Sequence, residues 1–139
     1  MDHIQNRQPV IAILDIGKTN KKSFLIDEHY RIVWENSCRF QETSDEDGDP
    51  CEDVKALGSW VHQSLQKMLA LPQYEVKAVN CSAYGASFVL IDENGQVTAP
   101  LYNYLKTYPA ELHRQFFRDY NNDGSLPGLT ASPVLGSLN

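Results

Sequence analysis

The sequence has few cysteines and no long apolar run, and each shortage excludes a class of protein. Its three cysteines, Cys38, Cys51 and Cys81, are odd in number and widely spaced, so we expect neither a disulfide framework nor a zinc site. The polar N-terminal residues MDHIQNRQP lack the apolar centre of a signal peptide, and no stretch approaches the length of a membrane span. We therefore expect reduced thiols and a cytoplasmic protein.

Positive charge is also scarce. The chain has 12 lysine and arginine residues against 18 aspartate and glutamate residues, which gives a net charge of −6. We therefore expect neither a nucleic acid nor a membrane as a partner. The 139 residues are enough for one domain with a core, and a hydrophobic content of 42% is ordinary for a globular protein.

The stretch VIAILDIGKTNKKSFLI, residues 10–26, concentrates the residue types that a phosphate site needs. An apolar run ends at Asp15, a polar turn contains Gly17, and a second apolar run follows, which predicts strands over 9–16 and 22–26 joined as a hairpin. Phosphates are bound by close backbone N–H groups, small donors and cations, while a carboxylate suits hydrated Mg²⁺. The alternative is a solvated turn whose lysines only protect a sheet edge. The other turn residues are Lys18, Thr19, Asn20, Lys21 and Lys22.

The rest of the chain predicts an α/β fold with a mixed central sheet of about five strands and flanking helices. A strand over 30–37 would complete an antiparallel three-strand meander. The nearly all-apolar first strand indicates burial on both faces at the sheet centre. A strand over 75–82 follows a helix, which implies a crossover. Further strands are expected over 88–91 and 97–104, joined by a turn at 92–95.

Three helices are expected. The first begins with Asp49 as its cap, has Pro50 in its first position and Glu52 in a capping box, and ends before Pro72. The second spans 109–120. A third begins at Ser132 and has no end within the sequence, which suggests a piece of a longer protein.

The acidic loop 41–49 does not match a calcium-binding loop. Its glycine falls at Gly48 instead of after the third ligand, and Ala56 stands where the bidentate glutamate belongs. We therefore interpret this loop as solvated surface, and Lys106, later in the chain, as a solvated charge.

The order of these elements resembles the N-terminal half of FGGY-type carbohydrate kinases, within the actin/hexokinase/Hsp70-like ATPase fold, which is RNase H-like. Residues 1–8 are polar and are expected to be flexible. The resemblance covers about residues 10–139 and implies a kinase lobe, 9–139, whose second lobe is absent. The stretch DIGKTNKK is similar to the first phosphate motif of the family. It implies that Asp15 serves Mg²⁺ and the phosphates through water. The implied cofactor-binding residues are Asp15, Gly17, Lys18, Thr19, Asn20 and Lys22.

The stretch NCSAYGASFVLID is most similar to the rhamnulokinase-like branch, in which an aromatic–Gly–x–Asp pattern holds the sugar. It implies that Tyr84, Gly85 and Ser87 border the sugar, with serine in place of the aspartate. The implied reaction is transfer of the γ-phosphoryl group of ATP, with Mg²⁺, to a hydroxyl of a ketose or deoxyketose. The general base would lie in the second domain, so no catalytic residue is assigned and the fragment alone is expected to be inactive. The full-length protein could form a homodimer.

Two other functions are compatible with parts of the pattern. A kinase-like module could hold a sugar or a partner without performing chemistry. An RNase H-type nuclease would share the sheet order, but its two-metal site needs several carboxylates. The end of the fourth strand carries Asn80, Cys81 and Ser82 instead, so Asp15 has no carboxylate partner there.

Overall fold

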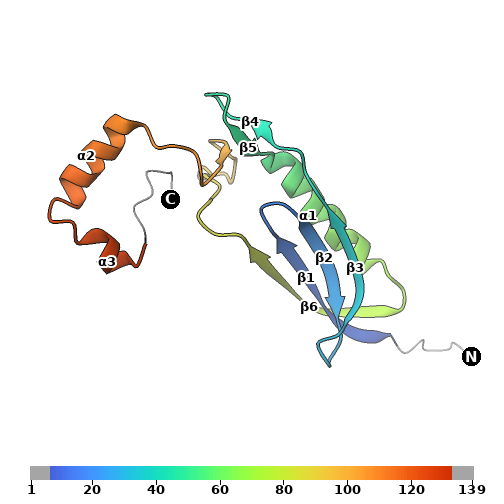
Figure 1. Ribbon diagram of the computed structural model, residues 1–139. Coiled ribbons are helices and arrows are strands. Elements are labelled where there is room, and N and C mark those ends of the chain that lie inside the picture. The colour runs from blue at the N-terminus through green and yellow to red at the C-terminus, as the bar shows by residue number, and fades with distance from the viewer. Residues whose placement is uncertain (1–6, 133–139) are drawn as a thin grey trace, which may run out of the picture. The chain divides into compact units, whose positions relative to one another are not determined.

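The computed structural model describes residues 7–132, which form parts of two compact units (Figure 1). The first unit comprises the chain up to Thr43 together with Glu52–Gly85. The second comprises Ser44–Cys51 and the chain from Ala86 onward. Each unit is described separately below.

The first unit is built on a four-stranded mixed sheet with the strand order β3-β2-β1-β6. Strands β1 (Gln8–Ile16), β2 (Lys21–Ile26) and β3 (Ile32–Cys38) form the predicted antiparallel meander. Strand β6 (Tyr74–Ala83) runs parallel to β1, after the crossover helix α1 (Val54–Leu69). The α/β class and the interior position of β1 are thus confirmed. This sheet has four strands within the described residues, whereas about five were predicted.

Helix α1 packs on one face of this sheet (Figure 1). Alternate residues of β1, namely Val10, Ala12 and Leu14, are buried and form a core with Leu25, Trp60 and Met68. Because no element of the first unit covers the other face, Ile11 remains 36% exposed. The prediction that β1 is buried on both faces is therefore wrong for the part of the chain that the structure describes.

The start of α1 differs from the prediction. Asp53 is the N-cap, and its carboxylate accepts a hydrogen bond from the backbone N–H of Ala56 at 2.9 Å. Pro50–Glu52 instead form strand β5, so the expected cap at Asp49 and the expected capping box with Glu52 are wrong. One of the two partners of β5 in its sheet is β7, about fifty residues away in sequence, and such pairing leaves no trace in the local pattern.

A second, three-stranded sheet has the order β4-β5-β7, with β4 at Thr43–Ser44 and β7 at Leu101–Tyr102. The expected strands over 88–91 and 97–104 are otherwise replaced by an isolated bridge between Ile91 and Val97. The turn between them forms as predicted, because the N–H of Gly95 donates to the carbonyl of Asp92 at 3.0 Å.

Helix α2 (Ala110–Tyr120) confirms the second predicted helix, and the short helix α3 (Leu126–Thr130) was not anticipated. The third predicted helix, from Ser132 onward, falls on residues 133–139, outside the described residues. Between residues 7 and 132, no helix is both long and apolar enough to span a bilayer.

The first described residues are already tied to the fold. Arg7 donates from its guanidinium to the carbonyls of Pro72 and Leu71, and the N–H of Gln8 donates to the carbonyl of Gln73 at 2.9 Å. Regular pairing therefore begins inside the segment 1–8 that was expected to be flexible. Residues 1–6 lie outside the described residues.

The turn between β2 and β3 is organised by the carboxylate of Asp27. It accepts hydrogen bonds from the backbone N–H groups of His29 and Arg31 and from the Arg31 guanidinium, at 2.9–3.0 Å. The side-chain hydrogen bond from Arg31, followed by its backbone hydrogen bond, lowers the pKa of Asp27 to about 2. Because this pKa lies below the ordinary value of 3.8, the ionised carboxylate stabilises the folded state.

This pKa predicts how stability depends on acid. The contribution of Asp27 should be fully present above about pH 4 and lost as the pH falls toward about 2, because the unfolded chain then binds the proton more tightly. Urea unfolding followed from pH 5 to pH 2 should show a shallower loss of stability for Asp27→Asn than for the parent. Equal slopes for the two proteins would contradict the proposed role of this turn.

Candidate functional site

The turn between β1 and β2 is closed so tightly that only glycine fits at its first position. The N–H of Gly17 donates to the carbonyl of Asn20 at 3.0 Å. A Cβ atom placed on Gly17 would lie 2.7 Å from that same carbonyl oxygen, well inside van der Waals contact. The sequence expectation of a glycine-dependent turn at this position is met by a specific steric constraint.

The turn leaves two backbone donors open. Within residues 7–132, the N–H groups of Lys18 and Thr19 have no hydrogen-bond acceptor in the protein. Thr19 is exposed and Lys18 is half-buried. Consecutive N–H groups in a turn of this kind form a concave site with affinity for anions. The arrangement therefore offers two donors of the kind that bind phosphate oxygens.

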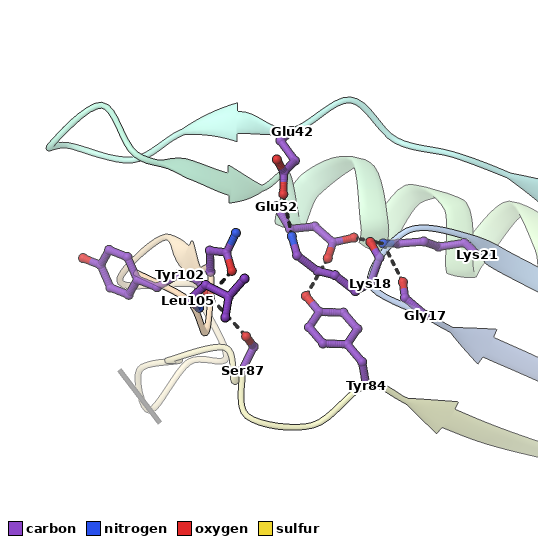
Figure 2. Close-up of polar contacts among 10 residues, drawn as sticks. Gly17, Lys18, Lys21, Glu42, Glu52, Tyr84, Ser87, Tyr102 and Leu105 are labelled. Atoms are coloured by element: carbon purple, nitrogen blue, oxygen red, sulfur yellow. Dashed lines mark hydrogen bonds and ion pairs between the residues drawn. The ribbon is translucent and has the colours of Figure 1, made fainter. Parts of the chain in front are cut away.

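A buried lysine lies beneath this turn. The side chain of Lys21 is 1% exposed, and its ammonium donates to the carbonyls of Gly17 at 2.9 Å and Lys18 at 3.2 Å. It also forms an ion pair with Glu52, whose side chain is 5% exposed (Figure 2). From the sequence, Lys21 was expected only as one of three lysines of the turn, and the basic position of the motif was expected at Lys22. The period-two burial of Lys21, Ser23 and Leu25 in β2 is the signal that identifies Lys21 as the inward-facing residue.

Glu52 connects this lysine to the end of β6. Its second carboxylate oxygen accepts a hydrogen bond from the hydroxyl of Tyr84 at 2.6 Å (Figure 2). The N–H of Tyr84 donates to the carbonyl of Ile16 at 3.0 Å, which extends the pairing of β6 with β1. The Lys21 ammonium also lies 5.4 Å from the ring centre of Phe40 and 5.8 Å from that of Tyr84. The turn, the entry to α1 and the end of β6 therefore share one buried polar network.

Two other predicted cofactor-binding residues contact the segment that follows β3. The ammonium of Lys18 lies 2.5 Å from a carboxylate oxygen of Glu42, and the guanidinium of Arg39 donates to the side-chain carbonyl of Asn20 at 2.7 Å. Exposed pairs of this type contribute little to stability, so the contact with Glu42 does not by itself exclude Lys18 from a phosphate site.

Asp15 and Lys22 lie directly opposite each other in the pairing of β1 with β2. Ser82 is the partner of Asp15 on the other side, in β6. Partners in register share a face of the sheet, and here it is the face opposite the buried Leu14. The carboxylate of Asp15 is half-buried and forms no hydrogen bond or ion pair with another described residue. A single free carboxylate fits Mg²⁺, which keeps several waters and takes few protein ligands.

In the described part of the chain, the only three acidic, histidine or cysteine side chains close enough to share a metal are Asp45, Asp47 and Asp49. The ammonium of Lys106 already occupies that position, at 2.6, 2.7 and 3.5 Å from their carboxylate oxygens. Hydrogen bonds with Asp45 and Asp47 raise the pKa of Lys106, and the bond from Lys106 lowers the pKa of Asp45.

This cluster bears on two expectations. Lys106 was predicted to be a solvated charge, but its side chain is 8% exposed and is surrounded by carboxylates. The loop 41–49 was predicted to be solvated, and every residue in it is exposed except Asp45, whose side chain is fully buried. The carboxylate of Asp45 also accepts hydrogen bonds from the backbone N–H groups of Asp47 and Asp49, and these bonds close the hairpin between β4 and β5. A lysine distant in sequence supplies the positive charge that the loop requires.

The three predicted sugar-binding residues fall into different units. Tyr84 and Gly85 belong to the first unit, and the hydroxyl of Tyr84 is engaged by Glu52. A Cβ on Gly85 would meet no atom within 4 Å, so nothing described requires glycine there. Ser87 belongs to the second unit, where its hydroxyl donates to the carbonyl of Tyr102 at 3.1 Å and lines a pocket of about 210 Å³.

Comparison with known proteins relates this arrangement to one group of enzymes. No family model matches the chain. A rhamnulokinase from Mannheimia succiniciproducens is 25% identical over 125 residues, which cover 87% of this chain and 23% of that protein. Over this stretch the chain is similar to a carbohydrate kinase. This confirms the resemblance identified in the sequence.

Solved structures of carbohydrate kinases share the fold. A carbohydrate kinase from Novosphingobium aromaticivorans matches with a TM-score of 0.70 and 23% identity over 91% of this chain and 26% of its own. Plasmodium falciparum glycerol kinase with ADP matches with a TM-score of 0.71 and 18% identity over 85% and 24% of the two chains. The expected actin-like fold is thus confirmed. The chain spans about a quarter of the length of these kinases.

Replacing Gly17 in the turn and Gly58 in α1 by alanine should have opposite effects on stability. Gly17→Ala should lower the free energy of unfolding by about 1–3 kcal/mol, because the new methyl group overlaps the carbonyl of Asn20. Gly58 is an exposed residue of α1, and a Cβ atom added there would meet no atom within 4 Å. Gly58→Ala should therefore raise the free energy of unfolding by up to about 1 kcal/mol, because alanine favours the helix. Urea unfolding monitored by tryptophan fluorescence measures both. A Gly17→Ala protein as stable as the parent would contradict the steric constraint.

Proposed function

We propose that this chain supplies the phosphate-binding part of an ATP-dependent sugar kinase, which transfers the γ-phosphoryl group of ATP to a hydroxyl of a ketose or deoxyketose. The observation that carries the proposal is the β1–β2 turn, where two open N–H groups lie next to the unpartnered carboxylate of Asp15. Its similarity to a rhamnulokinase supports the sugar class. Because the chain spans about a quarter of that relative, the activity of the whole protein is part of the proposal.

The residues of the turn would have distinct roles. The N–H groups of Lys18 and Thr19 would bind phosphate oxygens, and the Thr19 hydroxyl and the Lys22 ammonium would add a donor and a positive charge. Asp15 would hold Mg²⁺ through water, and Mg²⁺ would neutralise charge on the phosphates. Phosphoryl transfer depends mainly on such positioning and charge stabilisation, which requires no reactive group from this chain.

The sugar would contact Tyr84, Gly85 and Ser87, and the general base would come from outside this chain. The roles of Gly17 and Asn20 would be to shape the turn, since the peptide groups of these two residues close it. We also propose a cytoplasmic location and, for the full-length protein, assembly as a homodimer.

Nucleotide binding by the 139-residue chain tests the phosphate part of the proposal. Asp15→Asn should weaken Mg²⁺-dependent binding of ADP by about tenfold, which corresponds to the loss of one charge-assisted contact worth about 1.4 kcal/mol. Isothermal titration calorimetry with and without Mg²⁺ measures this. Asp119→Asn, the same chemical change on an exposed residue of α2, is the matched control and should leave the affinity unchanged.

The activity itself requires the product of the intact gene. That protein should transfer phosphate from ATP to at least one member of a panel of ketoses and deoxyketoses, detected by coupled ADP release and by mass spectrometry of the sugar. Sugar binding without phosphoryl transfer would instead support a non-catalytic sugar-binding module. Neither binding nor transfer with any sugar in the panel would overturn the proposal.

A further inference from the structure

The ammonium of Lys21 contacts the same two peptide groups whose N–H groups are open. The carbonyl of Gly17 and the N–H of Lys18 belong to one peptide unit, and the carbonyl of Lys18 and the N–H of Thr19 belong to the next. The Lys21 ammonium donates hydrogen bonds to both carbonyl oxygens, at 2.9 and 3.2 Å. Since a trans peptide group is planar, its N–H points opposite to its carbonyl. Both N–H groups are thereby directed away from Lys21, to the outside of the turn.

A cation on a carbonyl oxygen also strengthens the N–H of the same peptide group as a donor. Hydrogen-bonded chains polarise one another, and the effect is larger where the local dielectric constant is low. The side chain of Lys21 is 1% exposed, so its field acts in such surroundings. With almost no exposed surface, the Lys21 ammonium cannot contact an anion itself. Its charge acts on an anion outside the turn by polarising these two peptide groups.

The position of Lys21 is fixed by an ion pair with Glu52. Burial of an ammonium group costs free energy unless the group is paired, and the Glu52 side chain, which is 5% exposed, provides the opposite charge. Glu52 is in turn oriented by the hydroxyl of Tyr84, at 2.6 Å from its second oxygen (Figure 2). The orientation of the two peptide groups therefore depends on a chain of contacts that reaches the end of β6.

We infer that Lys21 is a positioning residue for a phosphate-type anion, which it orients through the Gly17–Lys18 and Lys18–Thr19 peptide groups without touching it. Glu52 and Tyr84 hold Lys21 in place. This inference rests on the proposed function for the identity of the anion, and it adds a residue that acts behind the turn. Substitution of Lys21 should thus weaken anion binding even though its side chain is buried.

The test uses a charge-neutral double substitution on the 139-residue chain. Lys21→Met together with Glu52→Gln removes one positive and one negative charge, so the net charge is unchanged and no unpaired charge remains buried. Pyrophosphate is the probe, and its affinity is measured by NMR titration of the amide signals. The affinity should fall by about tenfold, the equivalent of about 1.4 kcal/mol. Tyr84→Phe should lower the affinity by only about threefold, because it removes a single hydrogen bond from a neutral hydroxyl to Glu52.

Two matched controls separate this effect from a general loss of structure or charge. Tyr74→Phe removes another buried hydroxyl bond of the same unit, to the carbonyl of Val33 at 2.8 Å, outside the network. Lys77→Met removes an exposed ammonium from β6. Both should leave the pyrophosphate affinity within about twofold of the parent.

A spectroscopic readout tests the mechanism without any ligand. The ¹³C signals of the Gly17 and Lys18 carbonyls should shift in the double variant, while the amide signals of the β1 core stay in place. A folded double variant with unchanged carbonyl shifts and unchanged affinity would overturn the inference. If pyrophosphate fails to shift the turn in the parent protein, the proposed function fails, and the carbonyl shifts alone then decide the role of Lys21. Should the double variant not fold, the same carbonyl shifts in Tyr84→Phe decide it.

Discussion

The first unit depends on one buried ion pair. Lys21 and Glu52 are almost fully excluded from solvent. Lys21 begins β2 and Glu52 ends β5, 31 residues later in the chain. Removing either partner alone would strand a charge in the interior, at a typical cost of about 3–5 kcal/mol. Because the lysine also holds the carbonyls of Gly17 and Lys18, the same pair fixes the shape of the turn. Stability and the candidate binding site are thus joined at a single contact.

In the first unit, the groups that hold the turn in place differ from the groups that would contact an anion. Below the turn, Glu52 and Tyr84 hold the lysine; Lys21 and Glu52 are buried and Tyr84 is half-buried, so the Lys21 ammonium is not accessible to a phosphate chain in the described structure. Above it are the open N–H groups of Lys18 and Thr19, and beside it on the uncovered sheet face lies Asp15. This division explains how an acidic chain can present a local site for an anion: the decisive positive charge is internal and acts through the backbone.

The parts of the fold that follow from local patterns could be predicted from the sequence. The hairpin around Gly17, the meander, α1 and its apolar stripe, and the crossover to β6 all have the expected periodicity and turn residues. The parts that depend on distant partners could not be predicted. Pro50–Glu52 have the composition of a helix start, yet they pair with β7, and Lys106 has the composition of a surface lysine, yet it neutralises Asp45.

The candidate site shows the same limit within a few residues. The sequence places Asp15 at the end of the first strand and Gly17 and Thr19 in the turn, but it selects Lys22 as the basic residue and does not identify Lys21 as the buried one, because both are lysines at the start of a strand. Only the strand register decides which of them faces inward. The most direct measurement is a crystal structure of the chain with Mg²⁺ and ADP. The account predicts phosphate oxygens within hydrogen-bond distance of the Lys18 and Thr19 N–H groups, with the Lys21 ammonium still on the opposite side of the turn. Phosphates bound elsewhere, or directly by Lys21, would contradict it.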